Sequence, residues 1–218
     1  MFTIEMQMER AQDVLIARTA LANLEELPVK GLANKVQDVR DRFGEGWLSI
    51  EGTRTRSIIL ARDLVEVSYD RTGGDQYGIA QGVLYDRYSG NNIYLRENGV
   101  SMVDIDHVVA LGNAWRTGAL MWDDQTREAY ANDPDVLLAV SASLNRQKQD
   151  KSYDGWQPPF SRYRAKYAAH QINIKRKYDL WVTPTEKNAM NAVLNTFIAT
   201  PLSVASFKRF EKVQPHAQ

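Results

Sequence analysis

The sequence has 218 residues and no cysteine, which excludes a disulfide framework, a thiolate metal site and a cysteine nucleophile. No stretch approaches the roughly 18 consecutive apolar residues of a membrane span. The first residues, Met1 to Met6, lack the basic segment and apolar run of a signal peptide. These absences predict a cytoplasmic protein of bacterial or phage type, because a chain without cysteine suits a reducing compartment.

The sequence also lacks an excess of charge of either sign. Its 27 basic and 27 acidic residues give a formal net charge of zero, which argues against a protein that coats DNA by charge alone. The charge is uneven, however, because residues 145–177 carry a net charge of +7 and the first 45 residues hold many of the compensating acids. The basic residues of that stretch are Arg146, Lys148, Lys151, Arg162, Arg164, Lys166, Lys175, Arg176 and Lys177.

The N-terminal residues 3–25 have the spacing of one amphipathic helix, which Pro28 and Gly31 terminate. Its expected apolar face consists of Ile4, Met8, Ala11, Leu15 and Ala22. We interpret this helix either as an arm packed on the body or as the contact of a homo-oligomer. The sequence therefore divides into an arm at residues 1–26 and one further domain at residues 27–218.

The rest of the chain alternates strand and helix patterns, which predicts an α+β fold with a small antiparallel sheet and surrounding helices. The expected strands are 65–68, 79–85, 93–95, 102–108 and 136–140. The expected helices are 57–64, 109–120, 124–131, 143–149, 160–177 and 183–198. The last begins with Thr183-Pro184-Thr185-Glu186, a capping box with proline at the first helical position.

One unit of this pattern carries side chains suited to chemistry. Asp106 and His107 end one strand, a second strand covers residues 136–140, and a helix then delivers Asn145. Cleavage of a phosphodiester needs an activated water, a base for its proton and a cation that stabilises the charge on the phosphate. Carboxylate and amide oxygens suit Mg²⁺, and imidazole is the natural base near neutral pH.

These residues resemble the motif of the HNH nucleases, also called ββα-metal or His-Me finger nucleases. The most similar branch is the bacterial and phage one grouped with the DUF1524 domains. The resemblance covers roughly residues 27–200. Its segments are Leu27-Pro28-Val29-Lys30-Gly31, Leu60-Ala61-Arg62-Asp63-Leu64, Ile105-Asp106-His107-Val108-Val109, Asn113-Ala114-Trp115, Leu137-Leu138-Ala139-Val140, Asn145-Arg146-Gln147-Lys148 and Trp156-Gln157-Pro158-Pro159.

The resemblance implies a metal-dependent endonuclease with a ββα-metal core that hydrolyses DNA with low sequence specificity. His107 would be the general base, and Asp106 and Asn145 would hold one divalent ion, Mg²⁺ or alternatively Mn²⁺. The residues expected to contact the DNA backbone are Arg146, Lys148, Lys151, Arg162 and Arg164. Asp104 shares the strand face of Asp106, where it either supports a metal ligand from behind or, by our preference, is a surface residue.

The chain departs from the motif at Val136, where these nucleases often have an asparagine that braces a loop. Asn132 or Asp135 are candidates to replace that hydrogen bond. The departure supports an alternative, a catalytically weak DNA-binding module that retains the HNH fold. A third hypothesis is an interaction protein whose N-terminal helix recruits a partner.

Overall fold

A computed structural model of the protein describes residues 3–69, 78–95 and 102–201. It is an α+β fold, as the sequence predicts, and its described strands form three small antiparallel sheets. The first two sheets are β1–β2 (Ser49–Ile50 and Thr53–Arg54) and β3–β4–β5 (Leu64–Tyr69, Ile79–Asp86 and Asn91–Leu95). The third pairs β6 (Val103–His107) with β7 (Leu137–Ser141).

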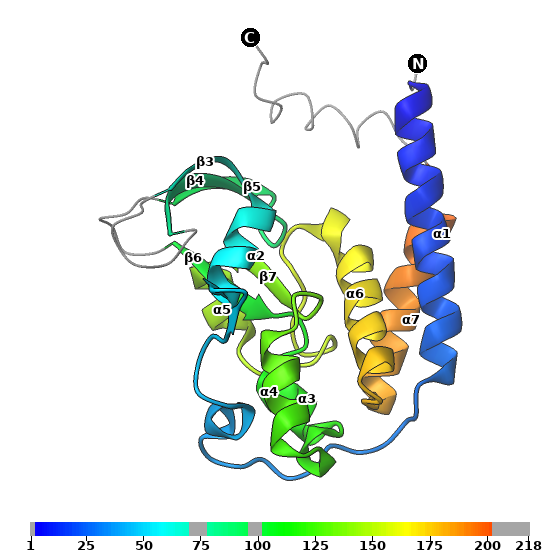
Figure 1. Ribbon diagram of the computed structural model, residues 1–218. Coiled ribbons are helices and arrows are strands. Elements are labelled where there is room, and N and C mark those ends of the chain that lie inside the picture. The colour runs from blue at the N-terminus through cyan, green and yellow to red at the C-terminus, as the bar shows by residue number, and fades with distance from the viewer. Residues whose placement is uncertain (1–2, 70–77, 96–101, 202–218) are drawn as a thin grey trace.

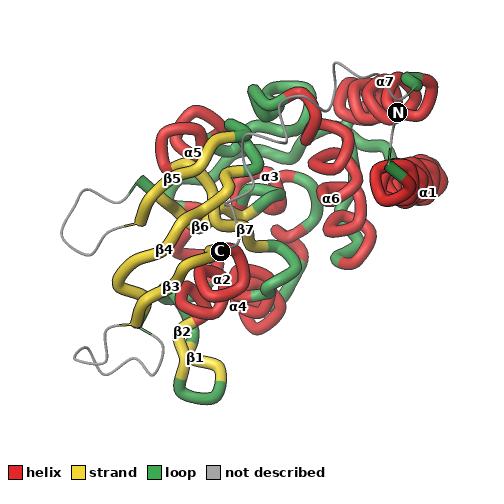
Figure 2. Tube along the Cα trace, turned by 90° about the horizontal axis from the view of Figure 1, so that it is seen from above, coloured by secondary structure: helices red, strands yellow, loops and turns green. Residues whose placement is uncertain are grey.

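The helices divide into two groups around these sheets (Figures 1 and 2). Three long helices lie side by side at one end, namely α1 (Ile4–Glu26), α6 (Arg164–Lys177) and α7 (Pro184–Ala199). Shorter helices accompany the strands, namely α2 (Thr55–Asp63), α3 (Leu111–Arg116), α4 (Asp124–Asn132) and α5 (Ala142–Lys148). Single 3₁₀ turns complete the described chain at η1 (Val39–Phe43), η2 (Ala119–Met121) and η3 (Ser161–Tyr163).

The hairpin of β6 and β7 lies between two apolar cores. Leu138 and Val140 face the larger core with α6 and α7, whereas Leu137 and Ala139 face the smaller core with α2 and β4. All five residues of β7 are buried. A strand buried on both faces is held in register by packing, so it is a rigid support for the residues that β6 carries opposite it.

The carboxylate of Asp86 joins two of the sheets. Asp86 ends β4, is fully buried, and accepts hydrogen bonds from the backbone N–H groups of Tyr88, Ser89 and Ser141. Because Ser141 ends β7 and caps α5, this one side chain ties the turn after β4 to the start of α5. A buried carboxylate needs such donors to offset its desolvation.

The N-terminal helix forms as predicted, but the face that it packs within the chain differs from the predicted apolar face. Its buried residues are Ala17, Ala20 and Leu24, and small side chains there let α1 lie close to α6 and α7. Ile4 and Met8 are 76% and 67% exposed. The buried residues include the large Leu24, whereas the small Ala11 and Ala22 of the predicted face are exposed. No described helix is long and apolar enough to cross a membrane.

Candidate functional site

The predicted catalytic residues lie on an antiparallel ββα unit made by β6, β7 and α5. In the register of the hairpin, Asp106 is opposite Leu138 and His107 is opposite Leu137. Successive side chains of a strand point to opposite faces, so Asp104 and Asp106 face α5 and His107 faces the smaller core. The Ser141 hydroxyl accepts from the N–H of Leu144 and begins α5 directly after β7.

Asp106 is an internal carboxylate with both oxygens engaged. Its Oδ1 accepts from the ammonium of Lys148 at 2.7 Å, and its Oδ2 accepts from the hydroxyl of Tyr88 at 2.5 Å. Burial raises the pKa of the Asp106 carboxyl, and the nearby Lys148 ammonium opposes that rise. The rings of Tyr88 and Tyr167 meet edge to face beside it, 5.5 Å apart.

Lys148 is fully buried and makes two strong contacts. Its ammonium bonds to Asp106 and also donates to the backbone carbonyl of His107 at 2.8 Å. Our sequence analysis assigned Lys148 to the DNA backbone, but in this structure its ammonium has no route to a phosphate. The i, i+3 spacing of Asn145 and Lys148 placed both on one face of α5, and that face meets β6.

Asn145 contacts Asp104 and not Asp106. Its amide Nδ2 is 3.4 Å from Oδ2 of Asp104, and both residues are partly exposed. Two pairs therefore join β6 to α5, an inner one of Asp106 with Lys148 and an outer one of Asp104 with Asn145. The inner pair is electrically neutral and buried, whereas the outer pair carries one negative charge at the surface.

His107 is held as a neutral imidazole of defined tautomer. Its Nε2 lies 2.9 Å from the carbonyl oxygen of Ala131, and because a carbonyl can only accept, Nε2 carries the proton. Nδ1 is then the unprotonated nitrogen, and it has no hydrogen-bond partner among the described residues. Burial lowers the pKa of His107 to about 3, with the Ala131 carbonyl opposing that shift.

The ring of His107 is also covered by Trp47. The two ring centroids are 5.9 Å apart with planes 10° from parallel. Trp47 precedes Leu48, whose N–H donates to the side-chain oxygen of Asn132 at 2.9 Å. Asn132 thus makes a loop-bracing bond of the kind we expected from Asn132 or Asp135, while Val136 is buried in the larger core.

The predicted Mg²⁺ site can be tested against these contacts. Asp104, Asp106 and Asn145 are hard oxygen donors on facing elements, which is the chemistry that Mg²⁺ prefers together with water and phosphate. Asp106, however, already has Lys148 as its cation, so a metal ion would share that carboxylate or replace the ammonium. Within residues 3–69, 78–95 and 102–201, no three His, Cys, Asp or Glu side chains are grouped as a metal site. The donor set therefore fits a divalent ion in chemistry, with few protein ligands.

The remaining predicted DNA contacts lie at the surface or near it. Arg146 and Lys151 are exposed on and just after α5, and among the described residues Arg146 forms no ion pair. Arg164 donates to the carbonyl of Pro158. Arg162 lines a cavity of about 490 Å³ between α1, α7 and the segment around the start of α6. Neither His107 nor Asp106 lines this cavity.

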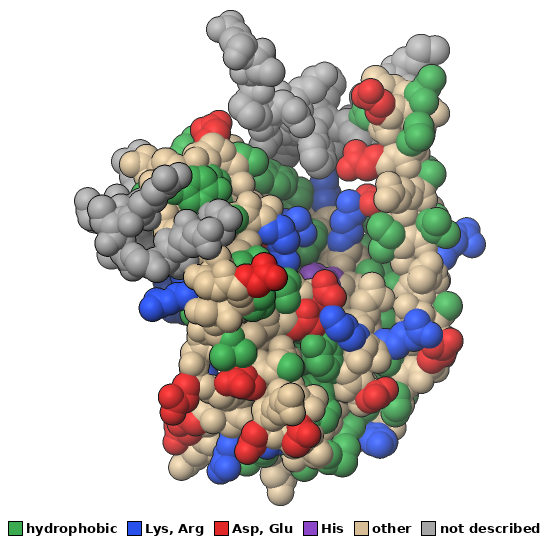
Figure 3. Space-filling model, viewed as in Figure 1, with side chains coloured by type: hydrophobic (Ala, Val, Ile, Leu, Met, Phe, Trp, Pro, Cys, Tyr) green, Lys and Arg blue, Asp and Glu red, His purple; other side chains and the backbone are tan. Residues whose placement is uncertain are grey.

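The basic stretch that the sequence showed is largely compensated in three dimensions. Five of its cations form ion pairs: Lys148 with Asp106, Lys166 with Asp13, Lys175 with Glu186, Arg176 with Glu26, and Lys177 with Asp133 and Asp135. Figure 3 accordingly shows acidic and basic side chains intermingled on the face in view. Two of the acids come from α1, so this helix lowers the local charge of α6.

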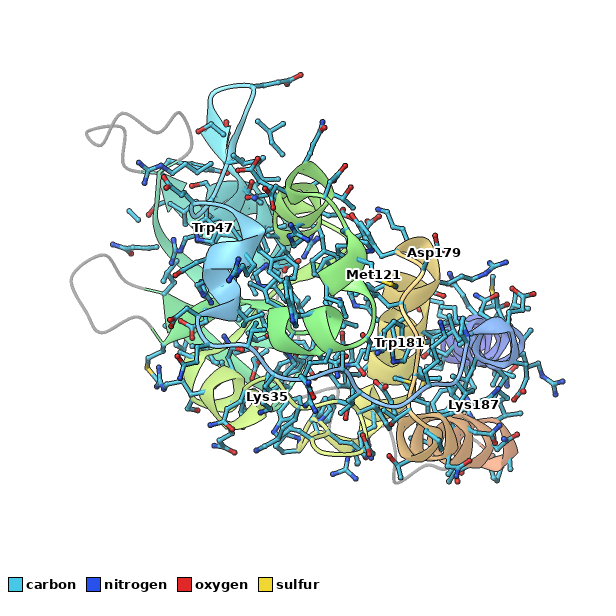
Figure 4. The ribbon with its side chains drawn as sticks, turned by 90° about the horizontal axis from the view of Figure 1, so that it is seen from below. Lys35, Trp47, Met121, Asp179, Trp181 and Lys187 are labelled. Atoms are coloured by element: carbon cyan, nitrogen blue, oxygen red, sulfur yellow. The ribbon has the colours of Figure 1, made fainter. Side chains whose placement is uncertain are left out.

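Three residues of the site were missed or undervalued from the sequence. Tyr88 and Trp47 gave no signal, because each reaches the site from a turn whose position depends on the tertiary fold. Asp104 had a signal, since strand alternation puts it on the face of Asp106, but we preferred a surface role for it. Figure 4 shows Trp47 at the sheet end of the molecule, whereas Lys187 lies on α7 at the helical end.

Comparison with known proteins identifies the matching family. The family described as GmrSD restriction endonucleases, C-terminal domain, matches residues 55–193. An uncharacterized secreted protein of Arthroderma benhamiae is 36% identical over 183 residues, which cover 83% of this chain and 85% of that protein. No solved structure matches the chain significantly.

The secreted relative contradicts our prediction of a cytoplasmic protein. That prediction relied on missing features, and a missing feature is weak evidence. A chain without cysteine is stable in an oxidising compartment as well as in a reducing one, because it has no thiol to oxidise and no disulfide to keep.

Proposed function

The chain belongs to the family of the C-terminal domains of GmrSD restriction endonucleases, and from this premise we propose that it is an endonuclease that hydrolyses DNA phosphodiester bonds. The observation that carries the proposal is the fixed tautomer of His107. Its proton is fixed on Nε2 by the Ala131 carbonyl, which leaves Nδ1 as a proton acceptor. A neutral imidazole on a rigid strand can take a proton from an attacking water.

In this proposal β6, β7 and α5 are the ββα core of an HNH nuclease, and Asp106 and Asn145 would hold one divalent ion, Mg²⁺ or Mn²⁺. When bound, it would supply positive charge beside the phosphate and the departing oxygen. The protein's own part is to orient the donors. Lys148 fixes Asp106 and the backbone of His107 to α5, and Tyr88 fixes the second oxygen of Asp106.

DNA would be held through its backbone by the exposed cations near Asn145, namely Arg146 and Lys151, with Arg162 and Arg164 further along the chain. Contacts to phosphate position a duplex without reading its sequence, so sequence specificity is low. Because the relative of Arthroderma benhamiae is a secreted protein, we place this activity outside the cell.

A plasmid-nicking assay tests the proposal. Wild type is expected to convert supercoiled DNA to nicked and linear forms with Mg²⁺ or Mn²⁺, and His107→Ala is expected to lower the rate by about 10² to 10⁴-fold, the usual contribution of a general base. Arg176→Ala, a change at an exposed cation paired with Glu26, is the control. Cleavage that survives His107→Ala undiminished contradicts the assignment of the base.

The alternative of a catalytically weak DNA-binding module is favoured by one observation, the occupation of Asp106 by Lys148. It predicts binding of a DNA duplex, measured by fluorescence anisotropy, without nicking in Mg²⁺, Mn²⁺ or Zn²⁺. The nicking assay therefore separates the two functions.

A further inference from the structure

We propose that Trp47 is a positioning residue for His107 that holds the imidazole plane in the orientation needed for proton transfer. Trp47 lies outside residues 55–193, the part of the chain that matches the nuclease family. This inference rests on the proposed function, since it assigns His107 the role of base. It adds a residue that acts through His107 and touches no reacting atom.

The first support is the geometry of the two rings. Their planes are within 10° of parallel and their centroids are 5.9 Å apart, which is within the range of offset-stacked aromatic pairs. The hydrogen bond from Nε2 to the Ala131 carbonyl fixes one point of the imidazole. One hydrogen bond still allows the ring to rock about that point, and an indole lying along its face removes this freedom.

The second support is that the end of α4 controls both contacts. Ala131 supplies the carbonyl that His107 contacts, and its neighbour Asn132 supplies the oxygen that binds the N–H of Leu48. Asn132 is 5% exposed, and its own amide donates to the carbonyl of Glu128. Two adjacent residues of one helix therefore set the position of the base and of the aromatic ring beside it.

The third support is that the Trp47 segment is fixed at its other end as well. The carbonyl of Leu48 accepts from both the N–H and the hydroxyl of Thr55, at 2.8 Å and 3.0 Å. On the other side, Gly44 has φ of 88° and its α-carbon lies so close to Glu128 that a β-carbon would be 2.8 Å from the Glu128 carboxylate. Close packing of Gly44 on Glu128 and the hydrogen bonds of Leu48 restrict the segment on both sides of the indole.

The test compares two substitutions at Trp47. Trp47→Phe keeps an aromatic ring and Trp47→Leu keeps apolar bulk without one. We expect Trp47→Leu to lower kcat by about 10²-fold with KM within twofold, because a small misplacement of a reacting group has an effect of that size. Trp47→Phe is expected to restore most of the loss. Trp115→Leu, which also removes a partly buried indole, is the matched control and is expected to keep kcat within twofold.

A second readout does not depend on activity. The chain has three histidines, so the carbon-bound imidazole protons of His107 can be resolved by NMR in histidine-labelled protein. The ring current of Trp47 is expected to displace these resonances in wild type, and Trp47→Leu is expected to return them toward random-coil positions while the resonances of His170 stay in place. Asn132→Ala, which removes the Leu48 anchor and keeps the indole, is expected to move them part of the way.

Several results overturn the proposal. They are an unchanged kcat in Trp47→Leu, an equal loss in Trp115→Leu, a loss confined to KM, and His107 resonances that ignore Trp47. If Trp47→Leu fails to fold, the resonances and kcat of Asn132→Ala decide in its place. Failure of the proposed function is distinguishable, because wild type would then not nick DNA, or nicking would survive His107→Ala, whereas the resonances report the contact of Trp47 with His107 in either case.

Discussion

Two lysines of this protein are buried against carboxylates, and their surroundings differ. Lys148 is paired with Asp106 at 2.7 Å and Lys175 with Glu186 at 3.3 Å. Each ammonium is fully buried and also donates to a backbone carbonyl, that of His107 for Lys148 and that of Trp181 for Lys175. Burial and ion pairing are therefore common to both and do not identify a functional site.

The neighbours of each pair make the distinction. Lys148 joins a strand to a helix beside a neutral imidazole and a partly exposed Asp104–Asn145 pair. Lys175 joins α6 to the capping box of α7, where Glu186 bonds to Thr183, and to Asn113 of α3. In the proposed function the first region gathers the groups that act on a substrate, whereas the second gathers groups that end and connect helices.

The largest expected effect is the removal of either ammonium. Lys148→Met and Lys175→Met should each lower the free energy of unfolding by about 3–5 kcal/mol, because each leaves a buried carboxylate unpaired. Urea denaturation at neutral pH measures this loss. Because both variants are less stable, kcat is measured at low temperature and expressed per folded molecule. Only Lys148→Met should lower this kcat. Equal loss of kcat in both variants would erase the functional difference between the regions.

The second prediction sharpens the comparison with a metal ion. In Lys148→Met, Asp106 lacks its cation, so Mn²⁺ at 100 times its Kd should stabilise the fold by about 2.7 kcal/mol. For a chain of this size, the midpoint temperature of unfolding should rise by about 5–10 °C. Lys175→Met should show no such rise, because Glu186 lies among helix caps. Calorimetric scans with Mn²⁺ and with EDTA measure both variants, and an equal rise in the two would contradict the metal assignment.

The third prediction uses pH to separate the regions. The pKa of His107 is lowered to about 3 by burial, whereas an unfolded chain has a histidine pKa of about 6.5. The unfolded state therefore binds the proton first, and stability is lost as pH falls below about 6.5. At pH 5 this loss is about 2 kcal/mol for His107. His107→Gln should remove it, so unfolding free energies at pH 7 and pH 5 should differ less in that variant than in wild type. Lys175 responds differently, because burial lowers its pKa below 10.5 and the folded state therefore releases this proton before the unfolded chain does, so its contribution to stability rises as pH approaches 10.5.

The smallest expected effect concerns two exposed arginines near the two regions. Arg146 lies on α5 next to Asn145, and Arg176 lies on α6 next to Lys175. Either change to alanine should alter stability by no more than about 0.5 kcal/mol. Arg146→Ala should weaken DNA binding and reduce the slope of log K against log salt by about one unit, and Arg176→Ala should leave both unchanged. Anisotropy titrations at four salt concentrations measure the slopes.

Much of the architecture was readable in the sequence because it depends on local pattern. Strand alternation and helix spacing located β6, β7 and α5, and the capping box at Thr183 and Glu186 formed as predicted. The order of Asp106, His107 and Asn145 along the chain indicated a nuclease. The match to a restriction endonuclease family agrees with a nuclease and does not test the HNH type.

The partners of those residues could not be read in the same way. Which oxygen of Asp106 meets Lys148, and which acid meets Asn145, depends on how α5 rotates against β6. That rotation is set by packing of the two cores and not by any local motif. The buried face of α1 differs from the predicted apolar face for a related reason, since contact with α6 and α7 buries Ala17, Ala20 and Leu24.

The carboxylate of Asp86 has a mechanical consequence for the unit made by β6, β7 and α5. It accepts hydrogen bonds both from the turn after β4 and from the N–H of Ser141. A displacement of the three-stranded sheet would therefore be transmitted to the first turn of α5. Asn145 and Lys148 lie on that short helix, one and two turns further on. Strain applied at the outer sheet, by a ligand or by a substitution remote from His107, would reach the ends of both β6–α5 pairs through a single side chain.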